Sequence, residues 1–243
     1  GLARGEIAAR YPQVDWIGIA DIDPARAKFV AEQLGADFHT TDYHQLLKRP
    51  EATAAVISTV GHQHVAPTLA ALENPNKLAL LIEKPIANEL AESQRVLEAI
   101  RAAGNDALIG YTQRFRRRWI VAKDKVVRGG LGEISTVSSR AFLNRLVAVN
   151  NYKRDSDPAL NSPMVISGTH ALDIVMWMME GKTPVELWAR STDKALGPLC
   201  KGTDATVGTM VFSDGTLYNS VVSWALPVSW PGAVYGLEVG IVG

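Results

Sequence analysis

Short apolar segments alternate with helical patterns through the first 110 residues of this chain. Strands are predicted at 14–20, 37–40, 54–59, 78–82 and 107–110, and helical patterns at 1–10, 24–34, 43–47, 65–72 and 89–103. Connections of this kind are right-handed crossovers, which give a parallel sheet with helices on both faces. The sequence therefore predicts an α/β domain with a doubly wound parallel sheet over residues 1–111.

The pattern changes beyond residue 111. Strands are predicted at 134–142, 185–190, 205–212, 216–225 and 234–242, with helices at 115–127 and 164–179. Asp214-Gly215 between two of these strands is typical of a hairpin turn. We expect a second, α+β domain over residues 112–243, with an open, largely antiparallel sheet, one helix (164–179) between its strands, and the most loop-like stretch at 150–163.

Composition gives no sign of a charged partner. The 243 residues carry 25 basic and 25 acidic side chains, so nothing favours nucleic acid or an anionic membrane surface. No apolar run approaches the roughly 20 residues that cross a bilayer. A single cysteine, Cys200, excludes an intramolecular disulfide and fits a reducing compartment. We expect a cytoplasmic protein.

Asp21 follows the predicted strand 14–20 and lies 20 residues after Gly1. In Rossmann-type domains an acidic residue at the end of the second strand binds the ribose, about 20 residues beyond the glycine fingerprint. The spacing predicts that Gly1 is the last glycine of such a fingerprint. We accordingly expect the first strand to be missing from this sequence, and the second domain to be incomplete at its C-terminal end.

Glu83, Lys84 and Pro85 follow the apolar run 78–82 at the expected carboxyl edge of the sheet. In open α/β sheets ligands bind at that edge. Pro85 restricts the backbone of Lys84, so the ammonium group is aimed in a defined direction. Taken alone, a surface lysine beside a strand-ending proline is the simpler interpretation.

Several motifs occur in a specific order along the whole chain: Ala20-Asp21, Ser58-Thr59 with His64, Glu83-Lys84-Pro85, Gly110-Tyr111 with Arg114-Phe115, residues 129–133, and Gly168-Thr-His170-Ala-Leu-Asp173. In this order and spacing the chain resembles the Gfo/Idh/MocA family of nicotinamide-dependent oxidoreductases, named after glucose-fructose oxidoreductase, inositol dehydrogenase and a rhizopine catabolism protein. The resemblance implies a cofactor-binding Rossmann domain followed by a substrate-binding domain.

The resemblance also implies roles for individual residues. Lys84 and His170 would be catalytic, the lysine as a donor and proton relay and the histidine as general base. The implied cofactor-binding residues are Gly1, Asp21, Thr59, Gly61, His64 and Glu83. The implied substrate-binding residues are Tyr111, Arg114 and Asp173. Because Asp21 repels a 2′-phosphate, NAD is expected rather than NADP.

One position departs from the family pattern. Many members carry an aspartate four residues before the histidine, and Ile166 stands there in this chain. His170 would then work with Lys84 alone or with Asp173. Without the resemblance, a lone histidine on an apolar helix is more often a core residue than a functional one.

Two other clusters have simpler explanations. His62 and His64 lack nearby cysteines or carboxylates that would complete a metal site, so no metal is expected. Arg114 and the run Arg116-Arg117-Arg118 favour a solvated or subunit-contacting face, with a substrate carboxylate or phosphate as the alternative.

These observations predict an NAD-dependent oxidoreductase that acts on a secondary alcohol or ketone of a sugar, cyclitol or related hydroxylated ring. Two alternatives remain open: a dehydratase or hydrolase that uses bound NAD transiently, and a cofactor-binding regulatory protein that lost the chemistry. The long sheet of the second domain predicts a homodimer or homotetramer that assembles through it.

Overall fold

The computed structural model describes residues 1–154, 162–229 and 235–243. These residues divide into two compact units, Gly1–Gly110 and Tyr111–Gly243. Each unit has its own sheets and hydrophobic clusters and is described by itself.

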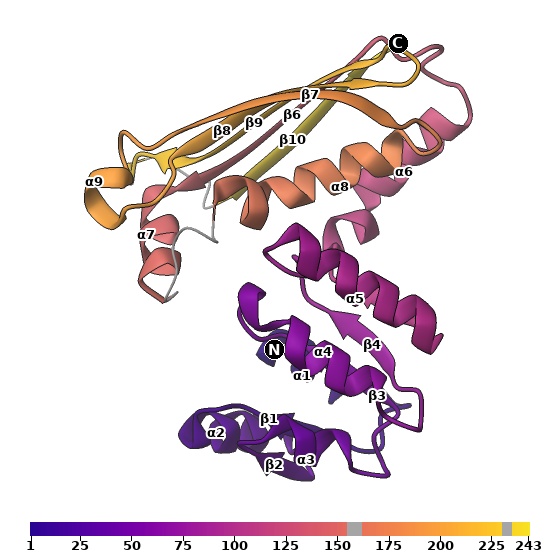
Figure 1. The fold of residues 1–243 in the computed structure, drawn as a ribbon, viewed down its shortest axis with the longest axis vertical. Helices are drawn as coiled ribbons and strands as arrows, with labels where there is room; N and C mark the ends of the chain where they lie inside the picture. Colours follow the sequence, from indigo (N-terminus) through magenta and orange to yellow (C-terminus); the bar gives the residue numbers. More distant parts are fainter. Residues whose placement is uncertain (155–161, 230–234) are drawn as a thin grey trace. The chain divides into compact units, whose positions relative to one another are not determined.

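The first unit alternates strands and helices (Figure 1). Its elements are α1 (Leu2–Ala8), β1 (Gly18–Ala20), α2 (Pro24–Leu34), β2 (Phe38–Thr40), α3 (Tyr43–Leu47), β3 (Ala54–Ile57), the 3₁₀ turn η1 (Gly61–Gln63), α4 (Val65–Leu72), β4 (Ala79–Ile82), α5 (Leu90–Ala103) and β5 (Ala107–Ile109). β1 and β2 pair in parallel, and β3, β4 and β5 form a separate three-stranded parallel sheet. The α/β class predicted from the sequence is confirmed.

Local signals set the helix ends of this unit. The Asp23 carboxylate accepts the amide N–H of Ala25 at 2.9 Å, and Pro24 opens α2 where no N–H is needed. Gly35 and Gly104 end α2 and α5 with φ of 62° and 66°, a conformation that glycine adopts without strain. Apolar side chains of β3, β4 and the helices then pack in one cluster around Leu78, Leu80 and Ile82.

β1 is shorter than predicted. The ladder covers only Gly18–Ala20, because the amide N–H of Ile17 is taken by the Asp37 carboxylate at 2.8 Å. Trp16 also folds close to Gly18, where a Cβ would lie 2.5 Å from its ring. The prediction of a strand over residues 14–17 is therefore wrong.

The second unit is built on one five-stranded sheet. Its elements are the 3₁₀ turn η2 (Thr112–Phe115), α6 (Arg117–Val127), β6 (Thr136–Asn144), α7 (Arg145–Arg154), the π-helix η4 (Met164–Gly168), α8 (Thr169–Met178), β7 (Pro184–Thr192), α9 (Gly197–Cys200), β8 (Ala205–Phe212), β9 (Leu217–Leu226) and β10 (Tyr235–Val242). The strand order is β10-β6-β9-β8-β7, and only β6 and β9 pair in parallel. The predicted α+β class is confirmed.

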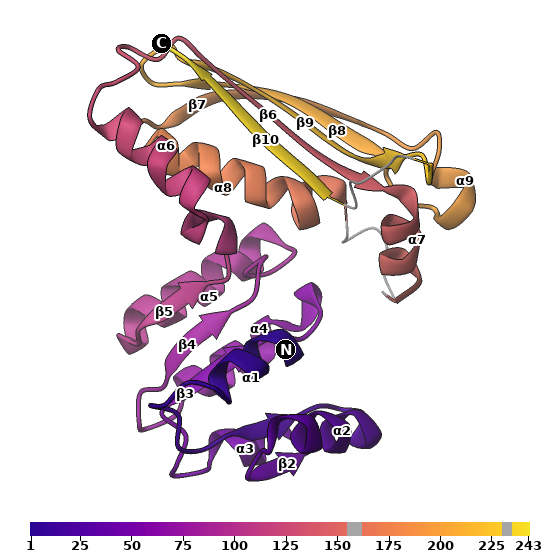
Figure 2. The same ribbon diagram turned by 180° about the vertical axis from the view of Figure 1, so that it is seen from behind.

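Helices α6 and α8 lie along one face of this sheet (Figures 1 and 2). Ile174 and Met178 of α8 pack against Val222 of β9, and Val175 packs in a cluster with Phe212. At Gly168 a Cβ would lie 2.8 Å from a methyl group of Val222, so the helix approaches the sheet closely there. The predicted packing of this helix on the sheet is confirmed.

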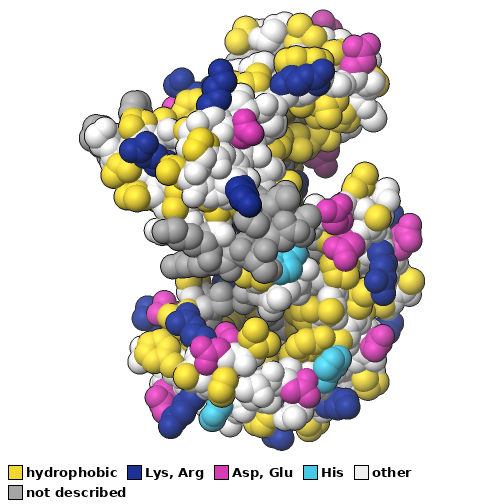
Figure 3. Space-filling model, turned by 60° about the vertical axis from the view of Figure 1, so that its left-hand side comes forward, with side chains coloured by type: hydrophobic (Ala, Val, Ile, Leu, Met, Phe, Trp, Pro, Cys, Tyr) yellow, Lys and Arg dark blue, Asp and Glu magenta, His cyan; other side chains and the backbone are white. Residues whose placement is uncertain are grey.

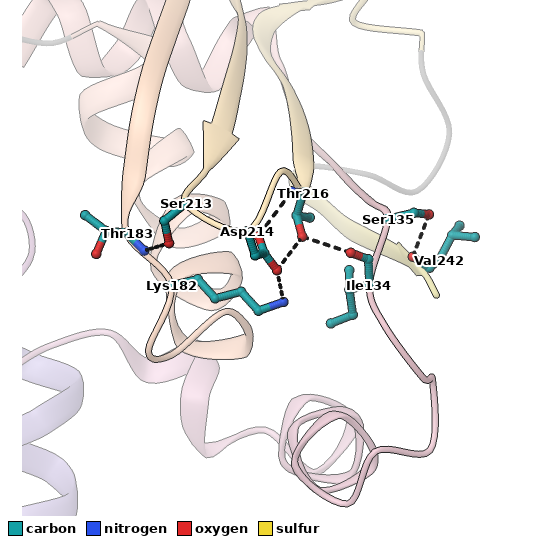
Figure 4. A network of polar contacts seen from close by, with 8 residues as sticks. All are labelled: Ile134, Ser135, Lys182, Thr183, Ser213, Asp214, Thr216 and Val242. Carbon is teal, nitrogen blue, oxygen red and sulfur yellow. Dashed lines mark hydrogen bonds and ion pairs between the residues drawn. The ribbon is translucent and has the colours of Figure 1, made fainter.

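The turn between β8 and β9 ties one end of the sheet together (Figure 4). Lys182 forms an ion pair with Asp214, whose carboxylate also accepts the amide N–H of Thr216 at 3.1 Å. The Thr216 hydroxyl lies 2.9 Å from the Ile134 carbonyl oxygen and 3.0 Å from the Asp214 carboxylate. Gly215 has a φ of 86°, as a turn glycine requires. The predicted Asp-Gly hairpin is confirmed.

The sequence prediction missed two helices of this unit, α7 and α9. The prediction of a single helix between the strands is therefore wrong. The loop predicted at 150–163 is wrong for residues 150–154, which belong to α7. Residues 155–161 of that stretch lie outside the described part of the chain. α7 forms because Ala148 and Tyr152 are buried against Leu143, Leu196 and Trp224.

Candidate functional site

The carboxyl end of β4 carries an ion pair. Glu83 follows the last strand residue, and its Oε1 accepts a hydrogen bond of 2.5 Å from Nε of Arg4 on α1. Both side chains are about three-quarters buried, with exposed fractions of 24% for Arg4 and 28% for Glu83. The ion pair therefore fixes the acid that stands directly before Lys84.

Gly110 leaves room for this pair. A Cβ on Gly110 would lie 2.9 Å from Nη2 of Arg4 and 2.9 Å from Oε2 of Glu83. Burial works to raise the pKa of Glu83, but the hydrogen bond and charge of Arg4, with the charge of Lys84, outweigh it and leave the pKa below its ordinary value. Glu83 is thus held in its ionised form.

Lys84 is half-buried beside Glu83, and the peptide bond between Lys84 and Pro85 is cis. Burial lowers the pKa of the Lys84 ammonium, while the negative charge of Glu83 partly opposes that shift. A partly desolvated ammonium group next to a fixed carboxylate is an effective hydrogen-bond donor toward a developing negative charge.

His64 connects the loop after β3 with the loop after β4. Its ring is buried, with Nδ1 2.7 Å from the carbonyl oxygen of Pro85 and Nε2 3.1 Å from the carbonyl oxygen of Thr59. The Thr59 hydroxyl donates to the carbonyl of Gln63 at 3.0 Å. Both ring nitrogens therefore face the protein backbone and hold the two loops together. Cofactor contacts by His64 and Thr59 stay a prediction.

Asp21 directly follows β1. One of its carboxylate oxygens accepts the amide N–H of Asp23 at 3.0 Å, and this bond orients the group. Gly1 caps α1 close to Ser58, whose hydroxyl oxygen would lie 3.0 Å from an added Cβ. Gly61 opens η1, where a Cβ would meet Asn88 at 2.6 Å. A two-oxygen acceptor and two glycines in crowded positions are compatible with the ribose diol and the close backbone approach of a dinucleotide.

In the second unit, Tyr111 meets the start of α8. Its hydroxyl lies 2.8 Å from the hydroxyl of Thr169, the first residue of that helix. The ring of Tyr111 stands edge to face against the ring of His170, with centroids 6.2 Å apart and planes at 86°. These contacts bring together two of the residues predicted for substrate chemistry.

Arg114 and Asp173 form a two-bonded ion pair. Nε of Arg114 donates to one carboxylate oxygen at 2.8 Å, and Nη2 donates to the other at 2.6 Å. The guanidinium group also lies 5.7 Å from the ring centre of Trp177. Since both oxygens of Asp173 already accept from Arg114, the geometry favours a structural ion pair over a carboxylate partner for His170.

Ile166 packs with the hydrophobic cluster of Leu143, Ala148, Tyr152, Leu196 and Trp224. Its position in the π-helix is therefore apolar in its surroundings as well as in its side chain.

Within the described ranges, no three His, Cys, Asp or Glu side chains are grouped to hold a metal ion. No helix among the residues that the structure describes is both long and apolar enough for a bilayer crossing. Over the described surface seen in Figure 3, basic and acidic side chains are interspersed.

The sequence prediction missed three residues that contact the predicted site residues: Arg4, Thr169 and Trp177. Arg4 carried a usable signal, because a basic residue in the first turn of a helix opposes the helix dipole and suggests an acidic partner elsewhere. Thr169 and Trp177 carried none, since their contacts depend on how η2 is placed against α8.

Comparison with known proteins agrees with this description. Residues 3–111 match the oxidoreductase family with an NAD-binding Rossmann fold, GFO_IDH_MocA. An inositol 2-dehydrogenase of Salmonella typhimurium is 26% identical over 170 residues, 68% of this chain and 47% of that protein. The 1-carboxy-3-chloro-3,4-dihydroxycyclohexa-1,5-diene dehydrogenase of Comamonas testosteroni is 24% identical over 225 residues, 87% of this chain and 55% of that protein.

A solved structure shares the fold over the whole chain. It is the scyllo-inositol dehydrogenase of Lactobacillus casei with bound NAD(H) and scyllo-inositol, with a TM-score of 0.85 at 18% identity, covering 100% of this chain and 70% of that one. The chain spans about half the length of the curated relatives it matches. Residues 3–111 thus match the Gfo/Idh/MocA family of oxidoreductases, with its NAD-binding Rossmann fold, and the chain is similar to members of that family.

Proposed function

We propose that this chain is part of an NAD-dependent dehydrogenase that moves hydride between nicotinamide and a secondary alcohol or ketone of a cyclitol, sugar or related ring. The observation that carries the proposal is the position of Lys84, half-buried at the carboxyl end of β4 and beside a glutamate that Arg4 holds ionised. The names of the inositol dehydrogenase relatives support a cyclitol substrate.

We assign cofactor binding to Asp21, Gly1 and Gly61. The Asp21 carboxylate accepts hydrogen bonds from the ribose hydroxyls and disfavours a 2′-phosphate through its charge. The glycines let the backbone pass close to the dinucleotide, because they carry no side chain that would stand between them. When bound, the nicotinamide accepts or returns the hydride.

We assign the proton chemistry to Lys84 and His170. The Lys84 ammonium donates a hydrogen bond to the reacting oxygen and stabilises the charge that develops on it. The imidazole of His170 takes the hydroxyl proton, because its unperturbed pKa lies close to neutral pH.

Turnover of the complete protein tests this proposal. We expect NADH formation with one or more members of a panel of cyclitols, sugars and cyclic diols. Lys84→Met should keep most of the NAD affinity, measured by calorimetry, and lose about 100-fold or more in turnover. Lys28→Met, which changes an exposed lysine of α2, is the matched control and should leave turnover unchanged. Near-normal turnover of Lys84→Met would return Glu83-Lys84-Pro85 to a simple strand-end turn.

A carboxylated ring diol is a second candidate substrate. The Comamonas relative, whose match covers 87% of this chain, is named for one. Two nitrogens of Arg114 already donate to Asp173, so its guanidinium group is not available for a two-bonded contact with such a carboxylate. A substrate of this kind would therefore depend on other basic groups, of which Arg116 and Arg117 are exposed. Including carboxylated diols in the panel separates the two substrate classes, and tight NAD binding without turnover of any substrate would favour a regulatory protein.

We also propose that the complete protein assembles as a homodimer or homotetramer in the cytoplasm. Strand alternation puts Val207, Leu217 and Val221 on the sheet face opposite α8, which supports an interface there. The single cysteine, Cys200, is consistent with a reducing compartment.

A further inference from the structure

Tyr111 contacts two consecutive residues at the start of α8. Its hydroxyl is hydrogen-bonded to the Thr169 hydroxyl at 2.8 Å, and its ring stands at 86° to the ring of His170. This hydrogen bond fixes the position of the Tyr111 side chain along the axis of α8. The edge-to-face contact then restricts how far the imidazole can rotate.

On α8, Asp173 carries a carboxylate three residues after His170. Both oxygens of Asp173 accept hydrogen bonds from Arg114. Ile166, four residues before His170, has an apolar side chain packed in the cluster around Trp224. On the face that Tyr111 shares with α8, the imidazole of His170 stands in edge-to-face contact with an aromatic ring.

We propose that Tyr111, held in place by the hydrogen bond between its hydroxyl and that of Thr169, is a positioning residue for the imidazole of His170. This inference rests on the proposed function for the role of His170, although the orientation itself can be measured without any turnover. Burial raises the pKa of Tyr111, although its bond with Thr169 opposes the shift, so the phenol stays protonated and the hydrogen bond persists at neutral pH.

Two variants separate the parts of this arrangement. Tyr111→Phe keeps the ring and removes the hydroxyl, while Thr169→Val removes the partner of that hydroxyl and keeps the size of the side chain. Because both break the same bond, we expect each to lower kcat/KM for the alcohol about 10- to 100-fold, and the double variant to lose no more than the single ones. KM for NAD should not change.

Nuclear magnetic resonance of histidine-labelled complete protein gives the second measurement. His170→Gln identifies the signals of that ring among the 5 histidines. We expect Tyr111→Leu to abolish the ring-current displacement of the His170 protons, and Tyr111→Phe and Thr169→Val to shift them by similar, smaller amounts. If Tyr111→Leu does not fold, the two milder variants carry the test.

Tyr218→Phe is the matched control, since it removes a buried tyrosine hydroxyl that is bonded to the Ser139 hydroxyl at 2.7 Å within the sheet. It should leave the His170 signals and kcat/KM unchanged. Unchanged His170 signals in all Tyr111 and Thr169 variants would overturn the inference while leaving the proposed function intact. Absence of turnover with every substrate would overturn the proposed function, whereas the spectra would still decide the orientation of His170.

Discussion

We propose that Asp21 decides whether the protein prefers NAD or NADP. It follows β1 with one oxygen oriented by the amide of Asp23, and Ile22 and Asp23 bring no positive charge next to it. A 2′-phosphate at this place would meet an uncompensated carboxylate. We expect the complete protein to bind NAD more tightly than NADP, and Asp21→Ala to narrow the ratio of the two dissociation constants in calorimetric titrations. Tighter binding of NADP by the wild-type protein would contradict the assignment.

Lys84 should show its environment in the pH dependence of turnover. Its pKa is lowered from 10.5 by burial, and the charge of Glu83 opposes that shift. The donor is present only while the ammonium keeps its proton, so kcat/KM should fall as pH rises through the lowered pKa. Glu83→Gln removes the opposing charge, and we expect it to move this alkaline limb to still lower pH. A limb that stays in place or moves upward in a pH–rate profile would show that Lys84 is not the titrating donor.

At the scale of single residues, the sequence predicted the groups at strand and helix ends but not their partners. The position of Lys84 follows from a five-residue apolar run and a proline, which are local signals. The ion pair between Arg4 and Glu83 joins residues 79 positions apart, and the Tyr111–Thr169 bond joins residues 58 apart. Such contacts depend on the tertiary arrangement, which no local pattern contains.

At the scale of elements, helices with a cap and a terminating glycine were predicted closely, as α2 shows. α7 was missed because its stability comes from Ala148 and Tyr152 packing beside Trp224, and not from a strong helical pattern. The π-helical turn before α8 was also missed. Close packing of Gly168 on Val222 accompanies that turn, and it has no signature in the sequence.

The turn between β8 and β9 should control the acid stability of the second unit. Lys182 holds the pKa of Asp214 at about 2, below its ordinary 3.8, and the amide and hydroxyl of Thr216 assist. Stability from a carboxylate with a lowered pKa is complete above 3.8 and is lost as pH falls toward 2. We expect Asp214→Asn to lower the urea midpoint at pH 7 and to flatten its decline between pH 4 and pH 2.

Asp124→Asn is the control for this measurement, because it removes an exposed carboxylate that pairs with Arg128 within α6. That variant should leave both the midpoint at pH 7 and its acid dependence close to wild type. An Asp214→Asn protein with an unchanged acid profile would show that the turn does not govern acid unfolding.

At the scale of the whole molecule, the proposed oligomer can be tested on the face of the five-stranded sheet opposite α8. β9 is the central strand, and Leu217 lies between Thr136 of β6 and Val211 of β8 on the sheet face opposite α8. A carboxylate in a buried interface is costly without a partner. We expect the complete protein to sediment as a dimer or tetramer and Leu217→Asp to sediment as a smaller species. Gln33→Asp, on the exposed side of α2, should not change the sedimentation coefficient.

The space reserved at Gly110 has a consequence for how this protein tolerates mutation. Gly110 is confined by the Arg4–Glu83 pair at 2.9 Å on two sides, and its φ is not among the positive ones, so volume and not backbone freedom limits the position. In a saturation library, substitutions at Gly110 should therefore rank by side-chain size, with alanine the mildest because the side-chain ends of Arg4 and Glu83 can shift. Large residues at Gly110 should then disturb the Arg4–Glu83 ion pair, although glycine brings no side-chain chemistry of its own to this position.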